Sequence, residues 1–96
     1  MAKASQVYSG STTIKLMYSY PEYGGGDFVF QTNISVPNCE GGFFMKQTDP
    51  GFKTSVAAVL SAQASGKTVV VWAEDSDLWP GSSDKTCRLY TIGVQS

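Results

Sequence analysis

The chain has 96 residues, of which 42% are hydrophobic and 12% aromatic, and it carries a net charge of −1. This composition is typical of one small folded domain and excludes a disordered chain. The basic residues are scattered, which argues against the basic face that nucleic-acid binding requires. No apolar run is long enough to insert into a membrane. Histidine is absent, and no nucleophile or nucleotide-binding motif is present, so we predict that the protein is not an enzyme and holds no cofactor.

The first seven residues form a polar lead-in to a single domain that we expect to span residues 8–96. Apolar and polar residues alternate over 13–20 and again over 27–34, which predicts two strands. The proline- and glycine-rich segment 21–26 lies between them, so the two strands should form a hairpin. After a Val-Pro-Asn break, a short third strand is expected over 43–46.

The middle of the chain predicts a helix that leads directly into a strand. Asp49 can cap the helix N-terminus with its side chain, and Pro50 suits the first helical position. Residues 52–64 contain no proline or glycine, and Gly66 supplies the left-handed residue that often ends a helix. Residues 68–73 are mostly β-branched or aromatic, as is typical of a strand.

An acidic loop over 74–85, which holds Trp79, and a last strand over 87–94 complete the chain. The expected order is therefore three strands, a helix and two strands. This is the order of the OB-fold, a five-stranded Greek-key barrel. The alternative is a mixed sandwich of three strands and a helix, but a helix between the third and fourth strands favours the barrel.

The predicted helix has two different faces. One face is broadly apolar and should meet the core; it consists of Phe52, Val56, Ala57, Val59, Leu60 and Ala64. The other is built of small uncharged residues, whereas a solvated face usually carries Lys and Glu. We predict that this second face packs against a neighbouring copy in an oligomer, through Ser55, Ala58, Ala62 and Ser65. A solvated Ala/Ser face is the alternative.

The two cysteines, Cys39 and Cys87, lie too far apart for a local metal or redox motif. The third strand begins soon after Cys39 and the last strand begins at Cys87, which would place both residues at one end of a barrel. We therefore predict a disulfide between them, with two buried free thiols as the alternative. A disulfide in turn predicts a secreted or periplasmic protein.

The acidic loop could supply oxygen ligands to calcium through Glu74, Asp75, Asp77 and Asp84. These residues lack the spacing and the central glycine of an EF-hand loop. Acidic surface loops are usually solvated, so we predict that the chain has no metal site.

The chain has more aromatic residues than the core of so small a domain needs, so some of them should lie at the surface. The candidates are Tyr8, Tyr18, Tyr20, Tyr23, Trp72, Trp79 and Tyr90. Aromatic faces beside hydroxyl, amide and carboxylate groups suit sugars, which stack through their C–H faces and hydrogen-bond through their hydroxyls. Tyrosine and tryptophan are also enriched at subunit interfaces. Sequence alone favours the two roles about equally.

Besides this order of elements, several short segments of the sequence match one known family. They are Tyr8-Ser9-Gly10, Met45-Lys46, the Ala-Ser-Gly-Lys end of the helix, the strand from Val69 to Trp72, and the late cysteine. Through these the chain resembles the B subunits of pertussis-like bacterial toxins, of the subtilase-cytotoxin and typhoid-toxin type. The resemblance implies an OB-fold that assembles into a ring-shaped pentamer with its helices around a central pore. It also implies lectin-like binding of sialylated or related cell-surface glycans.

The resemblance also implies site residues. Ser9, preceded by Tyr8, matches the serine with which the family contacts the sugar acid, and Lys46 is a weaker counterpart on the third strand. The family's tyrosine after the helix–strand turn is not matched, and Trp72 lies next to its place. An enzymatic A-type subunit would be a partner, although similar small domains occur in bacteria without one. The alternative is an OB-like module that binds a protein partner or single-stranded nucleic acid.

Overall fold

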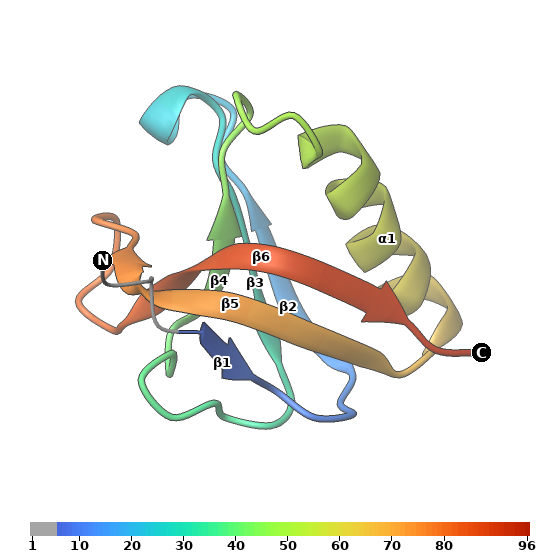
Figure 1. Cartoon of the computed structure of the whole chain (residues 1–96). Helices are drawn as coiled ribbons and strands as arrows, with labels where there is room; N and C mark the ends of the chain where they lie inside the picture. Colours follow the sequence, from blue (N-terminus) through green and yellow to red (C-terminus); the bar gives the residue numbers. More distant parts are fainter. Residues whose placement is uncertain (1–5) are drawn as a thin grey trace.

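Residues 6–96 are described by the computed structural model of the chain, which consists of one mixed sheet and one long helix (Figure 1). In chain order the elements are β1 (Gln6–Tyr8), β2 (Ile14–Ser19), the 3-10 helix η1 (Tyr23–Gly25), β3 (Phe28–Thr32), β4 (Gly42–Met45), α1 (Phe52–Ser65), β5 (Val69–Leu78) and β6 (Thr86–Val94). Part of the predicted polar lead-in, residues 1–5, lies outside the described residues. Its last two residues, Gln6 and Val7, belong to β1.

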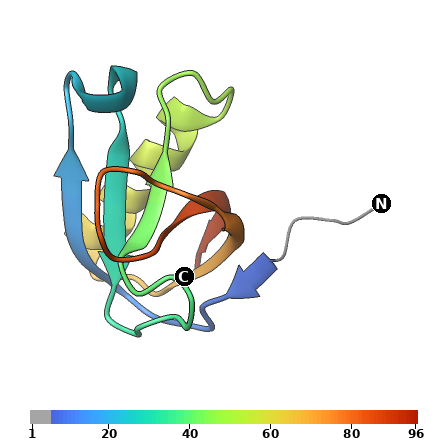
Figure 2. The ribbon, with the colours of Figure 1, turned by 90° about the vertical axis from the view of Figure 1, so that its left-hand side faces the viewer.

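The six strands form one sheet in the order β1-β5-β6-β4-β3-β2. All neighbours are antiparallel except β4 and β6, which are parallel. The two edge strands, β1 and β2, follow one another in the sequence, and Thr12 between them forms a bridge with Val69 of β5. In Figure 1 the long strands β5 and β6 cross in front of β2, β3 and β4, and Figure 2 shows the same crossing from the side.

The prediction of a mostly β domain with one helix after the third predicted strand, β4, is confirmed, but the sheet has six strands, not five. The extra strand is β1, whose three residues are too few to show an alternating pattern. The predicted acidic loop is also too long, because β5 continues through Glu74 to Leu78. Trp79, one of the candidates for a surface aromatic, is buried.

The predicted disulfide is present: Cys39 and Cys87 are bonded to each other. The bond excludes the free-thiol alternative, and both residues are buried. They belong to the main hydrophobic core, whose other buried members are Phe28, Phe30, Val36, Phe43, Met45, Val59, Ala62, Val69, Val71 and Ala73. The bond links the segment before β4 to the start of β6, and β4 and β6 are neighbours in the sheet.

The helix packs on the sheet through a face that only partly matches the predicted one, since Phe52, Val56 and Val59 meet the core as expected. Val59 and Ala62 are the buried residues of α1, and Phe52, Ser55, Val56 and Ala58 are half-buried. Ala57, Leu60 and Ala64, which were expected in the core, are exposed. Positions 52, 55, 59 and 62 follow helical spacing, so this face is continuous. The small side chain of Ala62 meets the protein's own core, and it cannot form the predicted subunit contact.

The start of α1 also differs from the prediction. The helix begins at Phe52 after Gly51, and no side chain caps it. The carboxylate of Asp49 accepts a hydrogen bond from the backbone N–H of Lys46 at 2.9 Å, so it holds the turn after β4 and does not cap the helix. At the other end, Gly66 ends the helix in the left-handed conformation with φ of 67°, as predicted.

Candidate functional site

Two aromatic side chains that are far apart in the sequence are stacked on the outer surface of the sheet. Tyr8 of β1 lies opposite Trp72 of β5 in the strand register. Their ring centroids are 4.5 Å apart with an angle of 28° between the ring planes. Tyr8 is 48% exposed and Trp72 is 40% exposed, although such large apolar rings are usually covered. The pair therefore presents a flat aromatic surface to the solvent.

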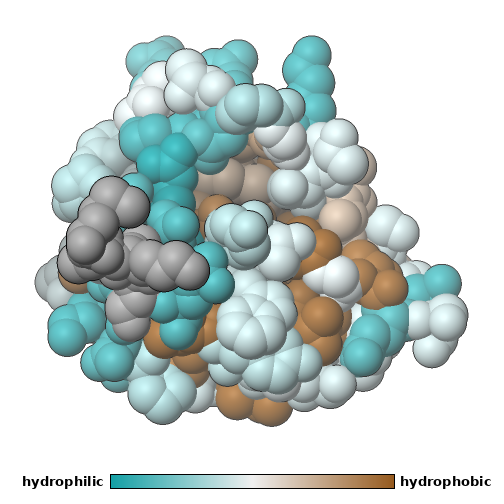
Figure 3. All heavy atoms as spheres, in the orientation of Figure 1, coloured by the Kyte–Doolittle hydropathy of each residue, from teal (hydrophilic) through white to brown (hydrophobic). Residues whose placement is uncertain are grey.

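The strand register shows which residues surround this pair. Val69, Val71 and Ala73 of β5 are fully buried, so the alternating positions Trp72 and Glu74 point outward. Across the three strands, one outward row is Tyr8, Trp72 and Thr91, and the next row is Gln6, Glu74 and Arg88. The aromatic pair is thus flanked by hydroxyl, amide, carboxylate and guanidinium groups. Figure 3, which views the molecule with β5 and β6 in front, shows hydrophobic residues reaching the surface between hydrophilic ones.

Ser9 lies under this surface and not on it. The side chain is 8% exposed, its hydroxyl donates to the carbonyl of Gly10 at 2.7 Å, and it accepts from the N–H of Val71 at 2.9 Å. The backbone N–H of Ser9 also donates to the carbonyl of Val71. Ser9 therefore fastens the end of β1 to β5, which positions Tyr8, and its only donor proton is already in use.

Lys46 belongs to a different part of the molecule. Its Nζ lies 3.4 Å from Asp27, a carboxylate that is 1% exposed and that also accepts a 2.7 Å hydrogen bond from Nε1 of Trp79. The rings of Tyr20 and Tyr23 pack against Trp79. This arrangement anchors the loop after β5. Of the four predicted site residues, the structure therefore brings Tyr8 and Trp72 together, places Ser9 beneath them and separates Lys46.

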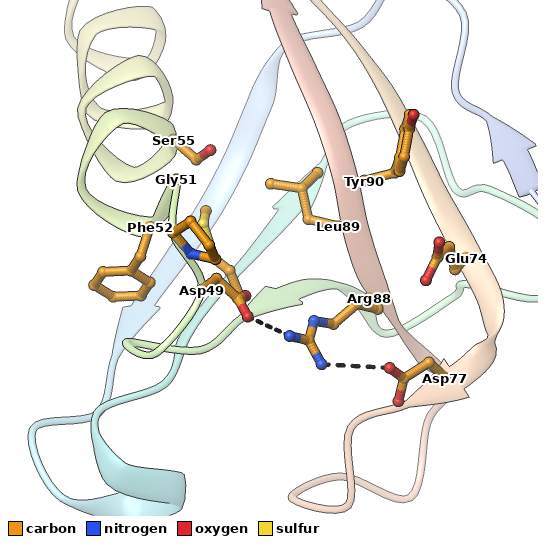
Figure 4. Close-up of a pocket in the computed structure, with 11 residues that line it drawn as sticks. Asp49, Gly51, Phe52, Ser55, Glu74, Asp77, Arg88, Leu89 and Tyr90 are labelled. Atoms are coloured by element: carbon orange, nitrogen blue, oxygen red, sulfur yellow. Dashed lines mark hydrogen bonds and ion pairs between the residues drawn. The ribbon is translucent and has the colours of Figure 1, made fainter.

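A pocket of about 280 Å³ adjoins the second outward row at Arg88 (Figure 4). The guanidinium is held between Asp49, which precedes the helix, and Asp77 near the end of β5. Glu74, Leu89 and Tyr90 line the strand side of the pocket, and Gly51, Phe52 and Ser55 line the helix side. Tyr90 is 62% exposed and stands beside Glu74 in the close-up.

Three carboxylates and one guanidinium line this pocket. Both oxygens of Asp49 are occupied, one by the N–H of Lys46 and the other by Arg88. Asp77 is more open, with 52% of its side chain exposed, and its Oδ2 lies 3.3 Å from Arg88. The pocket is therefore negative overall, in spite of its arginine.

The sequence analysis did not predict this pocket. It interpreted Asp49 as a helix cap and Asp77 as part of a solvated loop, and it gave Arg88 no role. One available signal was that Arg88 is the only charged residue of the last strand. A charge inside a strand facing a folded neighbour generally needs an opposite charge nearby.

Within residues 6–96, no group of three or more His, Cys, Asp or Glu side chains is arranged to hold a metal ion. In the same part of the chain, no helix combines the length and the apolar character required to cross a membrane. Comparison of the chain with protein-family models, with curated proteins and with solved structures finds no match.

Proposed function

We propose that this protein binds glycans and that the stacked pair Tyr8 and Trp72 is the centre of the binding surface. The observation that carries the proposal is the exposure of two large rings that share a face of the sheet. A sugar ring can lie on such a surface with its C–H groups against the aromatic faces. The flanking side chains of Gln6, Glu74 and Thr91 can then hydrogen-bond its hydroxyls. Nothing in this role requires catalysis.

We also propose that the sheet is a Greek-key barrel of the OB type. In this interpretation β1 and β2 are the two halves of one bent strand, which pairs first with β5 and then with β3. The bridge between Thr12 and Val69 supports it, since it joins the segment between the halves to β5. Counted in this way the barrel has five strands, and the resemblance to pertussis-like toxin B subunits gains support from the topology.

A ring-shaped homopentamer of an exported protein is part of the same proposal, with an enzymatic A-type subunit as an optional partner. The disulfide supports export, since such bonds persist in oxidising compartments. The outer face of α1 supports a subunit contact, because it exposes Ala57, Leu60 and Ala64 and carries Lys53 as its one charge. We propose this face as the subunit contact in place of the predicted one, because Ala62 of the predicted face is buried within the protein.

A glycan array tests the function, with Tyr8→Ala and Trp72→Ala as the diagnostic variants. Each removes half of the stacked surface, and we expect about a tenfold loss of affinity for the bound glycan. Tyr18→Ala is the matched control, because Tyr18 is 46% exposed but lies on β2, away from the pair. Its binding should equal that of the parent.

Three results would contradict the proposal. Absence of any bound glycan would favour the module that binds a protein partner. Equal losses in Tyr8→Ala and Tyr18→Ala would move the site elsewhere. Tight binding to single-stranded oligonucleotides that weakens steeply with salt would indicate a nucleic-acid role.

A further inference from the structure

We infer that the glycan site extends from Tyr8 and Trp72 into the Arg88 pocket, and that this pocket accepts a neutral or amine-bearing sugar unit and disfavours an acidic one. The inference rests on the proposed function and specifies its ligand class. It departs from the sialylated glycans that the resemblance implies.

The two parts of the surface are continuous. Trp72 and Glu74 are two positions apart on the same face of β5, which separates them by about 7 Å. Glu74 lies opposite Arg88 in the register and also lines the pocket. Tyr90, next to Thr91 of the first row, lines the pocket as well. An oligosaccharide with one unit stacked on Trp72 can therefore place a following unit over Glu74 and into the pocket.

The lining suits a polyhydroxyl group. Asp77 and Glu74 can accept hydrogen bonds from sugar hydroxyls, and the remaining N–H groups of Arg88 can donate to sugar oxygens. Ser55 adds a hydroxyl on the helix side, and Leu89 and Tyr90 supply apolar surface (Figure 4). A concave site with apolar walls and a few converging polar groups is the usual form of a small-molecule site.

The charge of the pocket selects among sugars. An acidic sugar would bring its carboxylate close to Asp77 and Glu74, and like charges at such distances repel. The guanidinium of Arg88 offers little compensation, because it is already held by Asp49 and Asp77. A protonated amine would be attracted by the same carboxylates, and a neutral sugar would meet no charge penalty. Ser9, the expected contact for a sugar acid, is enclosed in the fold.

The test compares the parent protein with Glu74→Gln and Asp77→Asn on paired glycans. The pairs are neutral oligosaccharides with and without terminal sialic acid, and oligomers of N-acetylglucosamine with their deacetylated, amine-bearing forms. The parent should bind the neutral glycan of each first pair more tightly than its sialylated counterpart. It should bind the amine-bearing oligomer of each second pair more tightly than its N-acetylated counterpart. Each variant should lose about threefold in affinity for the amine-bearing oligomers and should discriminate less against the sialylated ones. Glu22→Gln, which removes a charge from an exposed turn that does not line the pocket, is the control and should bind like the parent.

The outcomes separate this inference from the function beneath it. If Tyr8→Ala and Trp72→Ala weaken binding as expected while Glu74→Gln and Asp77→Asn bind every glycan as the parent does, the aromatic surface stands and the extension is wrong. A parent that prefers the sialylated members also overturns the inference and leaves glycan binding intact. A parent that binds no glycan at all overturns both.

Discussion

The indole nitrogen of Trp79 donates a 2.7 Å hydrogen bond to Oδ2 of Asp27, and both side chains are buried. Trp79→Phe would remove this donor and leave the buried carboxylate with Lys46 alone, at 3.4 Å. An unsatisfied buried acceptor costs about 1–3 kcal/mol, and the smaller ring adds a packing loss. We expect Trp79→Phe to lower the free energy of unfolding in urea by at least this amount. Trp72→Phe, at an exposed position, should stay within about 0.5 kcal/mol of the parent; equal effects of the two would contradict the assignment.

The helix provides a second prediction from two alanines on different faces. Ala62 is 1% exposed, so Ala62→Glu would bury a carboxylate in the apolar core and should cost more than about 4 kcal/mol. Ala64 is exposed, and Ala64→Glu should change stability by less than about 0.5 kcal/mol. Thermal melts followed by circular dichroism measure both. If the outer face of α1 is a subunit contact, Ala64→Glu should also lower the mass in solution by light scattering, whereas a monomeric parent would end the ring proposal.

Ser9 supports the aromatic pair from below. Ser9→Ala would leave the buried N–H of Val71 without its partner, and we expect a loss of about 1–3 kcal/mol in the free energy of unfolding. Ser11→Ala is the control. The Ser11 hydroxyl forms an exposed hydrogen bond to Gln95, so its removal should change the free energy of unfolding little. A Ser9→Ala protein as stable as the parent would show that the hydroxyl does not fasten β1.

The disulfide makes the fourth prediction. Cys39 and Cys87 are 48 residues apart, and closing a loop of this length stabilises the fold by about 4 kcal/mol on the chain-entropy account. The free energy of unfolding of the double variant Cys39→Ser, Cys87→Ser, measured in urea, should be lower than that of the parent by a comparable amount. Intact mass checks the bond itself: the folded, unreduced protein should take up no alkyl groups, and uptake of two would show free thiols.

Much of the fold could be predicted from local pattern. The existence of strand β2, the capping glycine Gly66 and the β-branched run at the start of β5 each depend on neighbours in sequence. The face of β2 that meets the core was not predicted, because a register irregularity between Ile14 and Leu16 interrupts the alternation. The faces of α1 could not be predicted as well, since apolar residues occur all around the helix and Leu60 suggested the wrong side. The extension of β5 through Glu74 was missed because acidic residues are uncommon in strands.

The candidate site was predictable only in part. The aromatic surplus pointed to Tyr8 and Trp72 as separate residues, but their contact depends on the register of β1 against β5, which local pattern does not determine. The Arg88 pocket was harder still. Asp49, Asp77 and Arg88 come from three segments, and nothing in the local sequence shows that they converge.

The pairing of β1 with β5 also sets an order of assembly. During synthesis Tyr8 has no partner until Trp72 has left the ribosome, whereas the β2–β3 hairpin can form early from neighbouring residues. Pairings between distant segments form slowly, because the entropy of closing a long loop opposes them. The stacked rings are therefore among the last contacts to form. A ligand that contacts both rings would therefore stabilise the pairing of β1 with β5 after the rest of the protein has folded.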